Sequence, residues 1–167
     1  MTRIFLFGSR RCPQLATAVR SELERLVEQG CEFLVGDANG ADKAFQRWLA
    51  SRHHERVRVF FVGSRPRNNL GHWLARRVET SARPGTFDFY AAKDREMSRQ
   101  ADEGLCIWDE ESRGTRRNIV DLSARAKKVL VYSTKRRAFL RPEDTEALGS
   151  STETGPERAE QLALPWR

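Results

Sequence analysis

Several features that define other classes of protein are missing from this sequence. The three cysteines, Cys12, Cys31 and Cys106, lie far apart and form no Cys-x-x-Cys pair, which argues against a zinc site and against a disulfide framework. The three histidines show no metal-ligand spacing either. We therefore expect no metal site, and no motif for a cofactor is evident.

Long hydrophobic runs are missing as well. No stretch approaches the roughly 18 consecutive apolar residues of a membrane-spanning helix. Met1 leads into a strand-like run and not into a basic leader with a long apolar segment. We expect no membrane association and a cytoplasmic location, and we find no internal repeat.

The composition is that of a small basic domain. A chain of 167 residues corresponds to one domain with a core of its own. Lys and Arg number 30 against 23 Asp and Glu, a formal charge of +7, which attracts small phosphates or nucleic acid. The alternative is a general preference for arginine on the surface, unrelated to any partner.

Apolar runs alternate with helical patterns along the chain. The runs predict strands at residues 3–7, 32–35, 57–62, 105–108 and 129–132. Between them we predict a helix opened by Pro13 and closed by Gly30, and a second helix from Gly40 or Ala41. Further helices are predicted at residues 70–79 and 91–103, and one that Thr115 can cap.

This alternation predicts an α/β fold. Right-handed crossovers place the helices on both faces of a mostly parallel, doubly wound, Rossmann-like sheet of five strands or slightly more. We assign residues 1–133 to this domain. Residues 134–167 are interpreted as a polar, weakly ordered tail, in which Leu162, Leu164 and Trp166 could dock on the body or on a partner.

Four loops are expected at the carboxyl edge of this sheet, where open parallel sheets bind ligands. They span residues 8–10, 36–42, 63–69 and 109–115, and all contain polar or charged residues beside glycine. Candidate ligand-binding residues in these loops are Gly8, Ser9, Arg10, Gly36, Asp37, Asn39, Gly40, Asp42, Arg67, Asn68, Asn69, Ser112, Gly114 and Thr115, and Lys93 on the predicted helix at residues 91–103 is a further candidate.

The second loop is the most informative of the four. Gly36 and Gly40 allow a close backbone approach before a helix N-terminus, which favours an anion such as phosphate. Asp37 and Asp42 fit as acceptors for ribose or base donors, or as first-turn helix residues. The alternative is a tight turn that Asn39 or Asp42 caps, since the pattern is neither a dinucleotide-binding nor a Walker motif.

The remaining loops repeat the same chemistry. Thr115 can donate to phosphate or merely cap a helix, and Ser9 and Arg10 can add a hydroxyl and a guanidinium. Asp94 and Asp109 form the one carboxylate pair that we consider for acid–base or nucleophilic catalysis. The alternative places Asp94 on a solvated helix face.

Taken together, these motifs resemble the SLOG superfamily, a Rossmann-like group that includes phosphoribohydrolases and the DNA-binding DprA proteins. The chain is most similar to the YspA/YpsA-related branch. The matching segments run in order through residues 7–10, 36–43, 67–69, 93–97 and 107–115. The resemblance implies a site for a nucleotide or nucleotide derivative at the strand ends, and a homodimer, since relatives are often dimers.

The sequence departs from the hydrolases of that superfamily at the catalytic motif. Their Gly-Gly-x-Gly-Thr-x-x-Glu motif corresponds to residues 111–118, which lack the double glycine and end in Asn118 where the hydrolases have a catalytic Glu. An amide cannot act as a general base. Lys93 stands where the enzymes use Arg and loses the bidentate fork.

Three functions are therefore considered. The first is a binding module or sensor for a nucleotide-derived ligand of the nucleotide-sugar or ADP-ribose type, with Asn118 among the ligand-binding residues. The second is an enzyme, either a nucleotide N-glycosidic hydrolase or a (deoxy)ribosyltransferase, in which Asp94 or Asp109 replaces the missing Glu. The third is a DNA-binding protein similar to DprA.

Overall fold

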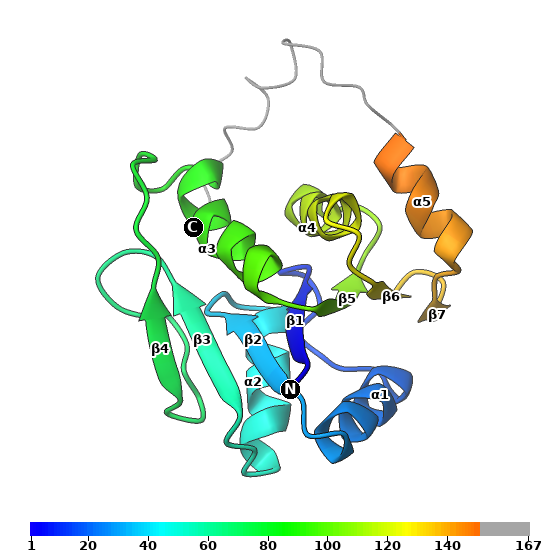
Figure 1. Cartoon of the computed structure of the whole chain (residues 1–167), viewed down its shortest axis with the longest axis horizontal. Helices are drawn as coiled ribbons and strands as arrows, with labels where there is room; N and C mark the ends of the chain where they lie inside the picture. Colours follow the sequence, from blue (N-terminus) through cyan, green and yellow to red (C-terminus); the bar gives the residue numbers. More distant parts are fainter. Residues whose placement is uncertain (151–167) are drawn as a thin grey trace.

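A computed structural model describes residues 1–150 of the chain (Figure 1). The first half contains β1 (Arg3–Gly8), α1 (Thr17–Glu28), β2 (Glu32–Gly36), α2 (Ala41–Ser51), β3 (Val57–Phe61) and β4 (Leu74–Arg77). The second half contains α3 (Phe87–Gln100), β5 (Glu103–Trp108), α4 (Arg113–Ala124), β6 (Val129–Ser133), β7 (Ala138–Phe139) and α5 (Pro142–Ser150).

The strands form one seven-stranded sheet in the order β4-β3-β2-β1-β5-β6-β7. All neighbours pair in parallel except β7, which runs antiparallel to β6. The chain winds from β1 outward to β4 and then returns to β5 on the other side of β1. The predicted Rossmann-like, mostly parallel sheet is confirmed, and β1 marks the point where the strand order reverses.

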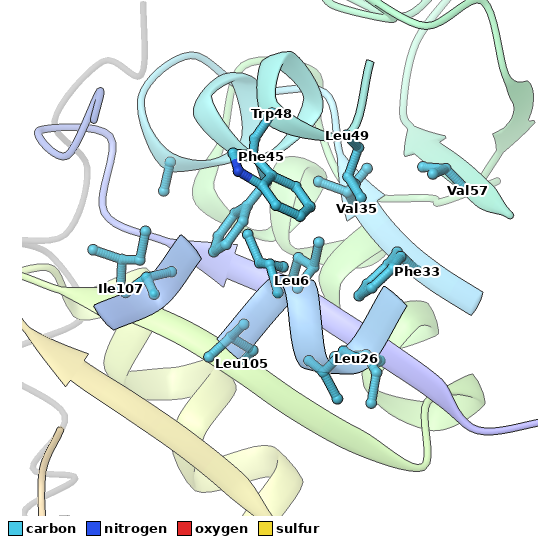
Figure 2. Packing of buried hydrophobic residues seen from close by; sticks show 14 of the residues in the cluster. Leu6, Leu26, Phe33, Val35, Phe45, Trp48, Leu49, Val57, Leu105 and Ile107 are labelled. Atoms are coloured by element: carbon cyan, nitrogen blue, oxygen red, sulfur yellow. The ribbon is translucent and has the colours of Figure 1, made fainter. Parts of the chain in front are cut away.

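One face of the sheet packs against α1 and α2. Leu6 on β1, Val35 on β2 and Ile107 on β5 meet Phe45 and Leu49 of α2 in this layer (Figure 2). The aromatic ring of Phe45 and the Leu49 side chain are fully buried. This packing holds α2 against the sheet, and the helix begins at Ala41, shortly after the carboxyl end of β2.

The opposite face packs against α3 and α4. The strands alternate, so Phe5 and Phe7 point to this side, where they meet Met97 of α3 and Ile119 of α4. Because both faces are covered, the central strands consist almost entirely of buried apolar residues, as expected for a parallel sheet. The two helix layers leave the carboxyl edge of the sheet to the loops.

The predicted helix at residues 70–79 is wrong, because residues 74–77 form the edge strand β4. The Asn69 side chain accepts from the Trp73 backbone N–H at 3.0 Å and donates to the Trp73 carbonyl at 2.8 Å. The Trp73 N–H and carbonyl are therefore bonded to a side chain, whereas a helix through this residue would use them in its own backbone hydrogen bonds. Leu74 is 71% exposed, so the strand lacks the buried face that reveals a strand in sequence.

Three helix starts also differ from the prediction. The first helix begins at Thr17, four residues after Pro13, and the segment between them is a loop. Helix α3 begins at Phe87, because the Thr86 side chain accepts from the Phe89 N–H at 3.3 Å, and it ends before Glu103, which opens β5. Ser112, not Thr115, caps α4.

The sheet continues beyond residue 133, where we placed the domain boundary. β7 pairs with β6, and Leu140 and Leu148 pack against the core layer under α3 and α4. The proposed docking residues Leu162, Leu164 and Trp166 lie outside the described residues. Among residues 1–150, no helix is both long enough and apolar enough to span a bilayer.

A substitution at Gly8 tests the close packing at the end of β1. A Cβ there would lie 2.7 Å from the Ala41 Cβ and would also meet the Ile107 backbone carbonyl. We expect Gly8→Ala to lower the free energy of unfolding by about 1–3 kcal/mol in urea denaturation, the usual cost of overpacking. Gly114→Ala is the matched control, since its Cβ would meet only Phe87, at 3.6 Å. Equal urea midpoints for the two variants would contradict the packing.

Candidate functional site

A pocket opens at the carboxyl edge of the sheet, beside the strand at which the order reverses. Its wall comes from the end of β1, the loop into α2, the first two turns of α3 and the start of α4. The lining residues are Phe7, Gly8, Arg10, Ala38, Asp42, Phe87, Tyr90, Ala91, Lys93, Asp94, Ser112, Gly114, Thr115 and Asn118. Eight of these, including Asn118, were predicted from the sequence as ligand-binding residues, and Asp94 was predicted as a catalytic residue.

The loop into α2 is locked against the loop that follows β1. Gly40 has φ +80°, and a Cβ on it would overlap the Arg10 backbone. The Ala41 N–H donates to the Ser9 carbonyl at 3.2 Å. A side chain at residue 40 would force these two loops apart. Gly40 therefore allows the two backbones to approach closely, as the sequence predicts.

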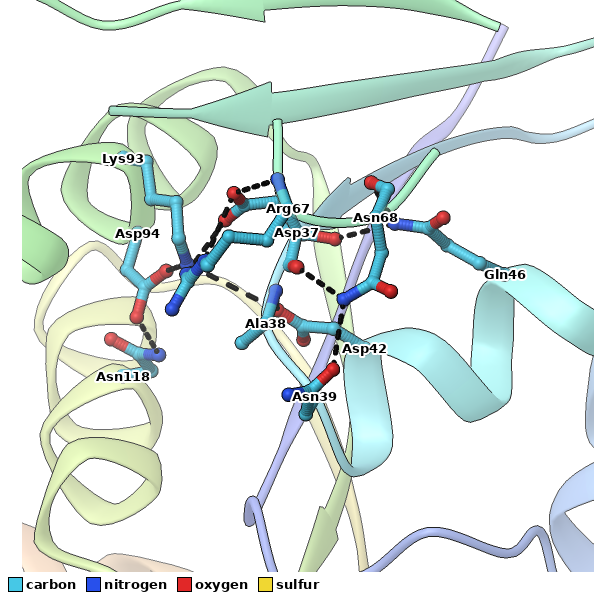
Figure 3. A network of polar contacts seen from close by, with 11 residues as sticks. Asp37, Ala38, Asn39, Asp42, Gln46, Arg67, Asn68, Lys93, Asp94 and Asn118 are labelled. Carbon is cyan, nitrogen blue, oxygen red and sulfur yellow. Dashed lines mark hydrogen bonds and ion pairs between the residues drawn. The ribbon is translucent and has the colours of Figure 1, made fainter. Parts of the chain in front are cut away.

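Asp37 is occupied within the protein by Arg67 (Figure 3). Its carboxylate accepts from the Arg67 guanidinium at 2.8 and 3.1 Å and from the Arg67 backbone N–H at 2.9 Å. Burial raises the pKa of Asp37, but the Arg67 hydrogen bonds and the charge of Lys93 outweigh it and lower the pKa overall. Asp37 therefore positions Arg67 and is ionised at neutral pH.

Asn68 closes the same loop onto α2. Its side-chain amide donates to the Asp37 carbonyl at 2.8 Å and to Asn39 Oδ1 at 3.0 Å. The structure thus brings these three predicted residues together outside the pocket wall. The Asn69 side chain bonds to the Trp73 backbone instead.

Gln46 is a residue that sequence reasoning missed. It is fully buried on α2, and its amide donates to the Gly36 carbonyl at 2.9 Å and to the Asn68 carbonyl at 3.1 Å. Its oxygen accepts from the Leu70 N–H at 3.0 Å. The available signal was a single amide within an apolar helix stripe, where a buried polar group needs partners.

A buried ion cluster lies deeper in the pocket. Lys93 is only 4% exposed, and its Nζ lies 2.8 Å from Asp94 Oδ1 and 4.0 Å from Asp42 Oδ2. The Asn118 amide donates to Asp94 Oδ2 at 3.0 Å. Gly36 leaves room for the cluster, since a Cβ there would lie 2.8 Å from the Lys93 Nζ.

The charges in this cluster are tightly linked. Burial by itself would lower the pKa of Lys93. The nearby carboxylates, above all Asp94, outweigh burial, so the pKa is raised overall and the ammonium stays charged. Burial raises the pKa of Asp42 to about 6, although Lys93 and the Ala38 N–H oppose the shift. The ionised Asp42 carboxylate can be buried here because the Lys93 ammonium lies beside it and offsets part of the cost of burying the charge.

Phe87, Tyr90 and Arg10 line the pocket, and further arginines lie against the two rings. The Arg67 guanidinium carbon lies 4.9 Å from the centroid of the Tyr90 ring, and that of Arg10 lies 5.8 Å from it. Burial and the adjacent Arg67 charge lower the pKa of Arg10. Phe87, one helical turn before Tyr90, is approached by Arg117 at 5.1 Å. Sequence reasoning missed both rings because it began this helix at residue 91.

Asp109 belongs to a separate hydrogen-bond network. It accepts from Ser9 Oγ at 3.0 Å and from the Ser112 and Glu111 N–H groups at 2.8 and 3.0 Å. Burial raises its pKa, but these hydrogen bonds outweigh burial and lower the pKa below the usual value. Asp109 thus shapes the loop before α4, whereas Asp94 is the carboxylate on the pocket wall.

The pocket combines anion-attracting groups with acceptors. Gly114 and Thr115 in the first turn of α4 line it, and a helix N-terminus favours an anion. The Ser9, Ser112 and Thr115 hydroxyls lie together, with the last two 3.0 Å apart. Among residues 1–150, no group of three His, Cys, Asp or Glu side chains is arranged to hold a metal ion.

Comparison with known proteins identifies a similar fold but no family. No protein-family model matches the sequence, and no curated protein matches it. A solved structure of DNA processing protein A from Helicobacter pylori, described for its single-stranded DNA binding mode, superposes with a TM-score of 0.60 at 15% identity. The match covers 89% of this chain and 73% of that chain. At this identity the likeness shows the fold alone, a Rossmann-like fold shared with a DprA protein.

The raised pKa of Asp42 predicts a difference in pH dependence between wild type and Asp42→Asn. The folded pKa of about 6 exceeds the usual 3.8, so this carboxyl destabilises the fold progressively as pH rises from about 4 to 6. Asp42→Asn has no carboxyl group at this position, so the variant does not lose folding stability in this way. We expect its unfolding free energy, relative to wild type, to increase by up to about 3 kcal/mol across that range, as measured by urea denaturation. Parallel profiles for the two proteins would show that Asp42 titrates normally.

Proposed function

We propose that this protein binds single-stranded DNA at the strand-end pocket. The observation that carries the proposal is the pair of arginines, Arg10 and Arg67, that lie against the ring of Tyr90, a residue of the pocket wall. Proteins that bind single strands combine cations for the backbone with aromatic faces on which bases stack. Both groups meet here at the place where open parallel sheets bind ligands.

Two further observations support this proposal. The formal charge of +7 favours association with a polyanion. The fold is shared with DNA processing protein A, whose structure was described for single-stranded DNA binding. DNA binding is thus consistent with the net charge and with the fold, and the arginines and aromatic rings at the pocket support it independently.

The geometry suggests a division of roles within the pocket. Arg10 and the first turn of α4, with Gly114 and Thr115, would hold a phosphate. Tyr90 and Phe87 would stack against bases, together with the guanidinium planes beside them. Asp37 would not touch the strand, because Arg67 already occupies its carboxylate.

Substitution of Tyr90 tests the stacking role. We expect Tyr90→Ala to weaken binding of a fluorescent oligothymidylate by roughly five- to a hundredfold, which corresponds to about 1–3 kcal/mol for one stacked base. Tyr90→Phe keeps the ring and is expected to bind like wild type. If Tyr90→Ala binds as well as Tyr90→Phe, the ring takes no part in DNA binding.

A compact nucleotide-derived ligand is the second candidate, as a sensor module or as a substrate. The observation that favours it is the floor of the pocket, where Asp94 and Asn118 present a carboxylate and an amide beside buried Lys93. These groups can accept from or donate to a sugar or a base. A small ligand filling this floor would need no extended strand.

A thermal-shift screen distinguishes this second candidate. A nucleoside phosphate, ADP-ribose or nucleotide sugar at a hundred times its dissociation constant would stabilise the protein by about 2.7 kcal/mol and raise the Tm by several degrees. The shift should depend weakly on salt, whereas DNA affinity falls steeply with it. Product analysis with wild type and Asp94→Asn shows whether the ligand is cleaved. If none of these ligands raises the Tm, the pocket is not a small-ligand site.

A further inference from the structure

We propose that the floor of the pocket binds a guanine base of the single strand through Asp94 and Asn118. This inference rests on the proposed function and adds a base preference to it. The observation behind it is a pair of neighbouring side chains on the pocket wall whose oxygens can accept more hydrogen bonds than the protein supplies. A ligand group that donates two hydrogen bonds side by side fits such a pair.

The Asp94 carboxylate is held at both oxygens but is not saturated. Lys93 Nζ lies 2.8 Å from one oxygen, and the Asn118 amide donates to the other at 3.0 Å. A carboxylate can accept about four hydrogen bonds, so roughly half of this capacity remains. The Asp94 side chain is 23% exposed and lines the pocket. Because a carboxylate and a phosphate repel each other, the ligand group that belongs beside Asp94 is a hydrogen-bond donor.

Asn118 adds an acceptor without a partner in the described part of the chain. Because a carboxylate only accepts, the Asn118 nitrogen must face Asp94, and the Asn118 oxygen is turned away from it (Figure 3). Asn118 is only 8% exposed, and its oxygen forms no hydrogen bond within residues 1–150. Buried polar atoms normally have partners, so an amide oxygen of this kind on a pocket wall points to a donor on the ligand.

The two acceptors lie one helical turn beyond the groups assigned to stacking and to phosphate. Tyr90 and Asp94 are four residues apart on α3 and therefore share one face of that helix. Thr115 and Asn118 are three residues apart on α4 and share a face in the same way. A base stacked on Tyr90 thus turns an edge toward Asp94. A sugar lacks the flat face that stacks on this ring, so the floor is suited to a base.

Guanine is the base whose donors match these acceptors. Its N1–H and its 2-amino group lie side by side on the Watson–Crick edge, which an unpaired base leaves free, and they can donate to two oxygens at once. Adenine and cytosine place an acceptor nitrogen beside their amino group, and thymine flanks its single N–H with two carbonyls. Those acceptors would face the oxygens of Asp94 and Asn118 with no proton between them, and an unpaired buried acceptor weakens binding.

Short oligonucleotides that differ at a single base test this preference. We would use fluorescence anisotropy to measure the affinity for thymidylates of about six nucleotides, within the usual site sizes for single strands, with guanine, hypoxanthine, adenine or thymine at one central position. We expect the guanine strand to bind roughly five- to a hundredfold more tightly than the all-thymine strand, the discrimination of one bidentate contact. Hypoxanthine keeps N1–H but lacks the 2-amino group, so its strand should bind with intermediate affinity.

Substitutions at the pocket floor test whether these two residues cause the preference. Asp94→Asn replaces an accepting oxygen by a donating nitrogen, and Asn118→Ala removes the second acceptor. We expect Asp94→Asn to bring the ratio of guanine-strand to thymine-strand affinity close to one and Asn118→Ala to lower it. Asp88→Asn is the matched control and should keep the wild-type ratio, since it removes an exposed carboxylate from the same helix outside the pocket wall. If Asp94→Asn fails to fold because Lys93 loses a partner, Asn118→Ala and the hypoxanthine strand still test the contact.

The outcomes separate this inference from the proposed function. If wild type binds all four strands equally, or if the guanine preference survives both floor substitutions, the base contact is wrong while DNA binding stands. If no strand binds, the proposed function fails, and the guanine site is then tested by thermal shift with deoxyguanosine monophosphate and thymidine monophosphate. A rise in Tm with the guanine nucleotide alone supports the site for a free nucleotide, whereas no rise, or an equal rise with both, overturns it.

Discussion

The pairing of buried charges at the carboxyl edge of the sheet is the constraint on which the site depends. Lys93 is almost completely buried and lies between Asp94 and Asp42, and Arg67 clamps Asp37 nearby. A buried charge without a partner costs several kcal/mol, so these groups are fixed as a set and not one at a time. Gly36 is part of the same constraint, because a side chain there would occupy the space of the Lys93 ammonium.

This pairing ties together loops that are far apart in the sequence. Asp37 follows β2, Arg67 follows β3, and Lys93 lies on α3, yet all contribute to one neutralised cluster (Figure 3). Gln46 completes the connection from α2 by bonding to Gly36, Asn68 and Leu70. The pocket wall is therefore pre-organised, which reduces the ordering cost when a ligand binds.

The same pairing decides which polar groups are available to a ligand. Asp37 binds Arg67, Asn68 binds the Asp37 backbone carbonyl, and Asn69 binds the Trp73 backbone, so these three side chains support the site from outside the pocket wall. Asp109 supports it from the other side by holding the loop before α4. The pocket itself presents arginine, aromatic rings, hydroxyls and the first turn of α4, a combination suited to phosphates and to stacked bases.

Local patterns in the sequence were sufficient for the parallel core of the fold. The runs at residues 3–7, 32–35 and 105–108 predicted buried strands because both faces of such a sheet are apolar, and the glycine-rich loops after them predicted the ligand-binding edge. The superfamily resemblance added Asn118 to the candidates. It also anticipated the likeness to a DprA structure.

Only the tertiary structure decided the rest. β4 escaped prediction because an exposed edge strand has no apolar alternation. Tyr90 escaped it because the helix was predicted to begin only at residue 91 and because Arg10 and Arg67, which contact its ring, come from other loops. Whether a carboxylate faces a ligand or an internal cation is likewise a matter of long-range pairing. The sequence by itself determined which residue types gather at the sheet edge, since strand ends are set by local hydrophobicity. Which of them remain free to bind was decided by contacts between distant segments, because a buried charge must find its partner wherever the fold brings one.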